Sequence, residues 1–65
     1  RHPKKQIRGA LETAVAEYGC DVEEGRGHWG LLHAPNGQQM SISGTPRDAD
    51  THAKQIIRFA RRNQN

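Results

Sequence analysis

The run HWGLLHAPNGQQMSIS, residues 28–43, decides the fold that we predict for this chain. It contains Asn36-Gly37, the dipeptide that most strongly indicates a tight two-residue β-hairpin turn. Apolar side chains recur on both sides of this dipeptide. We therefore predict two antiparallel strands, over 28–34 and 38–43, joined by the Asn-Gly turn.

A two-residue turn would also set which residues face each other in the hairpin. It pairs His33 with Met40 and Leu31 with Ile42, because side chains alternate between the faces of a strand. The face expected to pack on the core holds Trp29, Leu31, His33, Met40 and Ile42. The solvent-facing side holds His28, Gly30, Leu32, Ala34, Gln39, Ser41 and Ser43. A longer loop that includes Pro35 would shift the register and could reverse this assignment.

Two stretches with helical spacing flank the strands. The first has an apolar stripe at Ile7, Ala10, Leu11, Ala14, Val15 and Tyr18. It predicts a helix over 3–18, with a proline in its first turn and Gly19 ending it. The second predicts a helix over 46–62, because Thr45 is a good N-cap and Pro46 suits the first helical position. Its expected buried stripe is Ala49, Ala53, Ile56, Ile57 and Ala60.

A weaker strand is predicted over 20–24, where acidic side chains around Val22 favour an edge position. The chain of 65 residues makes a single domain, 1–65. Because only one face of the sheet is apolar, both helices should pack on that face. The expected fold class is α+β, with the order α-β-β-β-α and a three-stranded antiparallel sheet.

Charge and cysteine content narrow the functional classes. Lysine and arginine number 10 against 7 acidic residues, which gives a net charge of +3 and a pI of about 9.6. This balance favours a polyanionic partner such as nucleic acid. The single cysteine, Cys20, excludes an intramolecular disulfide, and a reducing cytosol is the simplest location. No apolar run approaches the ~20 residues needed to span a bilayer.

Four histidines suggest a metal site, but their spacing disfavours one. His28 and His33 lie on one predicted strand at positions of opposite parity, so they point to opposite faces. His52 has no histidine or cysteine one helical turn away, and His2 lies in a terminus expected to fray. Cys20 has no clear base beside it and is expected to fill the core. We therefore expect no metal site.

His28 is the strongest catalytic candidate. Glycines flank it, Arg26 stands nearby, and the predicted register leaves it on the open face near Ser43. An imidazole can move a proton at neutral pH, and a guanidinium can hold a phosphate. The alternative is a surface histidine without a function. Trp29, by contrast, is expected to anchor its strand in the core.

The order of elements, the Asn-Gly-type hairpin and the Arg26-Gly27-His28 element resemble those of HicA-type toxins. These are small mRNA interferases with a double-stranded-RNA-binding-like fold. The resemblance covers residues 4–62. Its specific part is the family's Gly-Ser-His element, whose histidine is catalytic and matches His28, with Gly27 in place of the serine and the preceding glycine at Gly25.

The resemblance implies an endoribonuclease that cuts mRNA without metal or cofactor, with His28 moving a proton as the ribose 2′-hydroxyl attacks its own phosphate. The expected RNA-binding residues are Arg26, Gly27, Ser43, Lys4, Lys5, Arg8, Lys54 and Arg58. The resemblance also implies a HicB-type antitoxin laid over the site. We expect the protein to be cytoplasmic and, when it is free, a monomer.

Two other functions remain open. A noncatalytic RNA-binding module of the same fold would bind RNA in a salt-sensitive manner without cutting it. A protein-interaction domain would dock a partner on the sheet edge or the polar face and would show no affinity for RNA at moderate salt.

Overall fold

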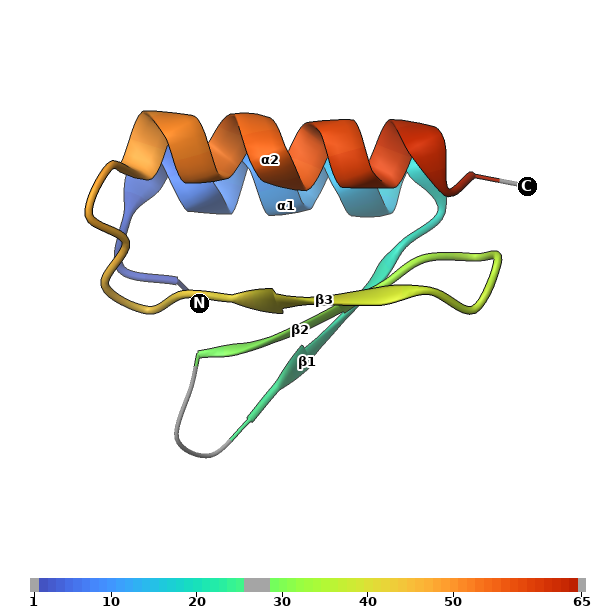
Figure 1. Ribbon diagram of the computed structural model, residues 1–65, viewed down its shortest axis with the longest axis horizontal. Helices are drawn as coiled ribbons and strands as arrows, with labels where there is room; N and C mark the ends of the chain where they lie inside the picture. The colour runs from blue at the N-terminus through green and yellow to red at the C-terminus, as the bar shows by residue number, and fades with distance from the viewer. Residues whose placement is uncertain (1, 26–28, 65) are drawn as a thin grey trace.

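The computed structural model describes residues 2–25 and 29–64, which form two helices and one antiparallel sheet (Figure 1). In chain order the elements are α1 (Lys5–Tyr18), β1 (Asp21–Glu24), β2 (Gly30–His33), β3 (Gln39–Ile42) and α2 (Ala49–Arg62). The fold class is α+β with the predicted order α-β-β-β-α. In the described part of the chain, neither helix has the length and apolar character that crossing a membrane requires.

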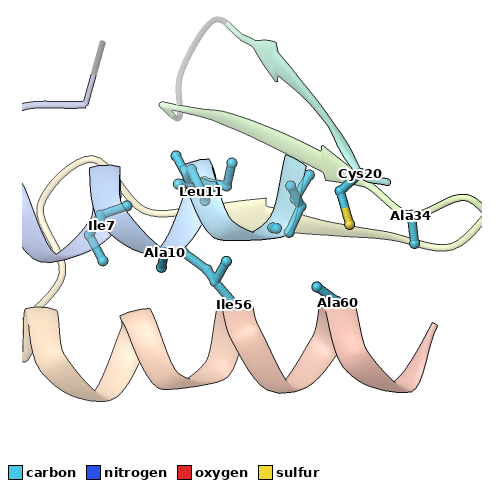
Figure 2. Close-up of a cluster of buried hydrophobic side chains, with 10 residues drawn as sticks. Ile7, Ala10, Leu11, Cys20, Ala34, Ile56 and Ala60 are labelled. Carbon is cyan, nitrogen blue, oxygen red and sulfur yellow. The ribbon is translucent and has the colours of Figure 1, made fainter. Parts of the chain in front are cut away.

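The helices form one layer and the sheet forms the other. α1 and α2 contact each other side by side and run in the same direction, as Figure 1 shows. The strands lie in the order β1-β2-β3, and each neighbouring pair is antiparallel. Between the layers, the core contains Ile7 and Leu11 of α1 and Ile56 and Ala60 of α2 (Figure 2). Both helices therefore pack on one face of the sheet, as predicted.

Helix α1 follows the predicted apolar stripe over most of its length. Its buried residues are Ile7, Ala10, Leu11 and Ala14. Val15, also assigned to the stripe, is 45% exposed. The helix begins later than predicted, because Pro3 precedes it and Lys4 is its N-cap in an extended conformation. It ends as predicted at Gly19, whose φ of 72° lies in the left-handed region that glycine adopts without strain.

Helix α2 begins at Ala49, and its N-cap is Asp48 in place of the predicted Thr45. The Asp48 carboxylate accepts hydrogen bonds from the Thr51 backbone N–H at 3.2 Å and from the Thr51 hydroxyl at 2.9 Å. A carboxylate has two acceptor oxygens and can satisfy both donors, which a threonine hydroxyl could do less well. The prediction of a helix over 46–62 was therefore three residues too long at its start.

The hairpin register differs by one residue from the prediction. His33 pairs with Gln39 and Leu32 pairs with Met40. The Ala34 N–H donates to the Gln38 carbonyl at 2.8 Å, so the loop comprises the three residues 35–37. The predicted two-residue turn was wrong.

The side chains of the loop explain the extra residue. Proline has a fixed φ that suits the first central position of a type I turn, where Pro35 stands. Gly37 follows with a φ of 94°, and its N–H donates to the Ala34 carbonyl at 3.1 Å. The Asn36 side-chain oxygen accepts the Gln38 N–H at 3.0 Å. A type I turn followed by a left-handed glycine is the common three-residue hairpin loop.

The change of register exchanges the two faces of β2. Gly30, Leu32 and Ala34, predicted to face solvent, are buried. Leu31 and His33, predicted to face the core, lie on the opposite face and are only partly buried. The faces of β3 were predicted correctly, since Ile42 lies in the core and Met40 packs against it. Trp29 also packs against the core, as predicted.

Substitution of two adjacent leucines tests this register. Leu32→Ala should lower the free energy of unfolding by about 2–5 kcal/mol, because Leu32 is fully buried and its truncation leaves a cavity. Leu31→Ala removes the same atoms from the outer face and should cost much less. Urea unfolding followed by circular dichroism measures both values, and a larger loss for Leu31→Ala would contradict the observed register.

The N-cap of α2 predicts a pH-dependent contribution to stability. Hydrogen bonds from Thr51 lower the pKa of Asp48 below its ordinary value of 3.8. Its stabilising effect is therefore complete above that value and is lost as the pH falls through the lower folded-state pKa. Asp48→Asn keeps a good cap without a titrating group. The melting temperature of the wild type relative to Asp48→Asn should fall on acidification below about pH 4, and a difference independent of pH would contradict the role of the carboxylate.

Candidate nucleic-acid interface

The predicted catalytic residue His28 lies outside the described residues, as do Arg26 and Gly27, which were predicted to bind RNA. The chain on either side of them is joined by a hydrogen bond from the Gly25 N–H to the Trp29 carbonyl at 3.1 Å. The predicted role of His28 is thus a hypothesis from the sequence.

Ser43, predicted to bind RNA beside His28, has both of its backbone polar groups bonded to histidines. Its carbonyl accepts a hydrogen bond from His2 Nε2 at 2.6 Å. Its N–H donates to His52 Nε2 at 3.1 Å. This arrangement joins the N-terminal segment and the first turns of α2 to the end of β3. The main role of Ser43 in the described structure is to hold the connection between β3 and α2.

The hydrogen bonds of the two histidines assign opposite tautomers. His2 Nδ1 accepts the Lys4 N–H at 3.0 Å, so Nε2 carries the proton donated to Ser43. His52 Nε2 accepts the Ser43 N–H, so Nδ1 carries the proton, and it lies 3.1 Å from Gln55 Oε1. The prediction that His2 lies in a frayed terminus was wrong, because its ring is almost fully buried.

A groove of about 690 Å³ lies between α1 and α2, and we call it the basic groove. Its cationic lining residues are Lys5 from α1 and Lys54, Arg58 and Arg61 from α2. Uncharged residues, among them Gln6, Ala10 and Ile57, line the rest, and its described lining contains no carboxylate. Among the described residues, none of the four cations forms an ion pair. Their charges therefore add to one positive surface.

The structure divides the predicted RNA-binding cations into two groups. Lys5, Lys54 and Arg58 share the basic groove. Lys4 is exposed at the start of α1 and lies outside this groove, while Arg8 points elsewhere and donates from Nη1 to the His2 carbonyl at 3.2 Å. Arg61 belongs to the groove but was not among the predicted site residues. Arg61 lies two turns after Lys54 and one turn after Arg58 on the same helix, and this spacing could have identified it.

A second cleft, of about 680 Å³, lies on the other side of α1, and we call it the aromatic cleft. Leu11 and Val15 of α1 and Val22 of β1 contribute its apolar lining. Trp29 and His2 also line it, with ring centroids 4.9 Å apart and planes tilted by 53°. Its charged lining residues are Arg8, Glu12 and Glu24. In contrast to the basic groove, this cleft combines an aromatic surface with charges of both signs.

On the outer face of the sheet, a histidine is hydrogen-bonded to a glutamate. His33 Nε2 lies 2.7 Å from Glu23 Oε1, across the β1–β2 pair. The prediction that His33 faces the core was therefore wrong, because the shift in register turned it outward. Within the described ranges, no group of three or more histidine, cysteine, aspartate or glutamate side chains is arranged to hold a metal.

The single cysteine is a core residue, as predicted. Cys20 is buried at the end of α1. Burial raises the pKa of its thiol, and the neighbouring charge of Asp21 raises it further. Because the thiolate is the nucleophilic form, both effects disfavour a catalytic role for Cys20.

Comparison of the chain with protein-family models, with curated proteins and with solved structures finds no match. The likeness to HicA-type toxins therefore rests on the residues that carry it, Arg26-Gly27-His28 and the Asn-Gly-type hairpin.

Proposed function

We propose that this chain binds RNA through the basic groove between α1 and α2. The observation that carries the proposal is the set of four cations that line one groove free of carboxylates in its described lining. Phosphates are the natural ligands for such a surface, since each one neutralised by a lysine or arginine releases a condensed counterion. The net charge of +3 acts in the same direction.

The geometry of the groove suits a chain of phosphates better than a single anion. Lys54, Arg58 and Arg61 follow one stripe along α2, and Lys5 stands across from them on α1. Contacts of this kind fix the position of a nucleic-acid backbone but read no sequence. The α-β-β-β-α order resembles that of the double-stranded-RNA-binding fold, and this resemblance favours RNA as the polyanion that the groove binds.

We propose further that the bound RNA is cut in the manner of a HicA-like toxin. His28 would accept the proton of a ribose 2′-hydroxyl as its oxygen attacks the adjacent phosphorus and the bond from phosphorus to the 5′-oxygen breaks. The support for this step is the sequence resemblance, as is the support for a HicB-like antitoxin as partner. The noncatalytic RNA-binding module is the alternative, and it shares the basic groove.

Neutralisation of one groove cation should weaken RNA binding and its dependence on salt. Arg58→Gln should reduce the slope of log K against log salt concentration by roughly 0.7–1, because one phosphate contact is lost. Arg47→Gln makes the same chemical change at an exposed residue outside the groove and should leave the slope nearly unchanged. Fluorescence anisotropy with a labelled RNA at several salt concentrations measures both slopes, and equal losses for the two variants would place the binding surface elsewhere.

Cleavage is tested separately from binding. With purified protein and RNA in the presence of a chelator, His28→Ala should lower the cleavage rate by about 10²–10⁴-fold, the usual contribution of a general acid or base. Its affinity for RNA should be retained. His33→Ala removes another histidine of the sheet and should cleave like the wild type.

If the wild type binds RNA without cutting it, the noncatalytic module is the correct function. Equal cleavage by the wild type and His28→Ala would show that His28 is not the catalytic residue.

A further inference from the structure

We propose that the aromatic cleft accepts one unstacked nucleobase of the bound RNA and prefers a base with an exocyclic amino group. This inference rests on the proposed RNA binding and adds a base-reading site to it. The basic groove can hold phosphates but has no described aromatic side chain on which a base could stack. The aromatic cleft provides both a stacking surface and polar groups at its border.

The cleft has the size and lining of a small-ligand site. Its volume of about 680 Å³ falls within the range usual for pockets that hold small molecules. Leu11, Val15 and Val22 give it apolar walls, and Val15 is 45% exposed toward solvent. Single-stranded RNA is recognised mainly by stacking its bases on aromatic side chains, and Trp29 is the one tryptophan of the chain.

The aromatic surface is held in place before any ligand arrives. His2 contacts the Trp29 ring and is fixed at both ring nitrogens, by the Ser43 carbonyl and the Lys4 N–H. Arg8 holds the same segment through its bond to the His2 carbonyl. Because these groups are already ordered, stacking of a base would cost little conformational entropy.

The charges at the cleft select among possible occupants. The Glu12 carboxylate accepts hydrogen bonds only, so it favours a ligand that brings an N–H donor into the cleft and disfavours one that brings an anionic group there, such as a fatty acid. A glutamate that accepts from the exocyclic amino group of cytosine is a known mode of base recognition. Uracil presents a carbonyl oxygen at the same position, which would face the carboxylate without a donor.

The positions of the two sites allow one RNA strand to use both. The groove residues Gly9 and Thr13 stand on one side of α1 and the cleft residue Val15 stands on another. Lys5 of the groove and Glu12 of the cleft are two turns apart and share the ridge between the two sites. The two sites are therefore separated by one helix, about 10 Å across with its side chains. A strand whose phosphates lie in the basic groove can pass over α1 and place a base in the aromatic cleft.

The test compares cytidine and uridine oligonucleotides that carry 2′-O-methyl ribose. Their methylated 2′-oxygen cannot attack the adjacent phosphate, so they bind without being cut. Trp29 fluorescence reports stacking directly because the chain has one tryptophan. The cytidine oligonucleotide should quench this fluorescence and bind about tenfold more tightly than the uridine oligonucleotide. A separate titration with cytidine monophosphate shows whether the cleft binds a free nucleotide or only a base that belongs to a bound RNA.

Two matched variants identify the group that reads the base. Glu12→Gln should abolish the preference for cytidine, because an amide can both donate and accept. Glu17→Gln makes the same change on the same helix, at an exposed residue that does not line the cleft, and should retain the preference. Val15→Gln fills the mouth of the cleft at an exposed helical position and should remove the quenching for every oligonucleotide.

The outcomes separate this inference from the proposed function. Equal binding of the two oligonucleotides without quenching, still weakened by Arg58→Gln, would overturn the cleft as a base site and leave the basic groove standing. Quenching by cytidine monophosphate without oligonucleotide binding would assign the cleft to a free nucleotide and would overturn both the RNA-bound base and the groove. Absence of both effects would overturn both proposals.

Discussion

The burial of Leu32 and Ile42 beneath the two helices is the interaction on which the remaining structure depends. Both side chains are fully buried, and they belong to neighbouring strands of a sheet that has only one covered face. In a chain this short the apolar area available is small, so few residues supply most of the burial. A turn that accommodates Gly37 at a positive φ places both of them on the covered face at once.

The parts of this fold that local patterns determine could be predicted, and the parts that distant contacts determine could not. Helical spacing and Gly19 gave the extent of α1 to within two residues. The hairpin itself followed from Asn36-Gly37, but its loop length depended on whether Pro35 joined the turn, and both lengths agree with local rules. The exposed placement predicted for Leu32 conflicted with its hydrophobicity, and the cost of that exposure decides the register.

The candidate site also combines features that local patterns predict with features that depend on distant contacts. The three groove cations that were predicted are exposed helical residues whose positions follow from spacing along the chain. The bonds from His2 and His52 to Ser43 join residues from three separate segments, and no periodicity in the sequence connects them. The aromatic cleft depends on His2 and was missed for that reason, because a terminal residue carries no local signal that it will be buried.

The contact between α1 and α2 has a consequence for how this protein forms during synthesis. α1 is the first element of the sequence and α2 is the last, yet they pack against each other along their length. Until α2 has left the ribosome, the apolar residues of α1 that it covers, Ile7 among them, have no permanent cover. The core therefore cannot close until α2 has been made. Because this core needs elements from both ends of the fold, synthesis of α2 sets the earliest moment at which it can form.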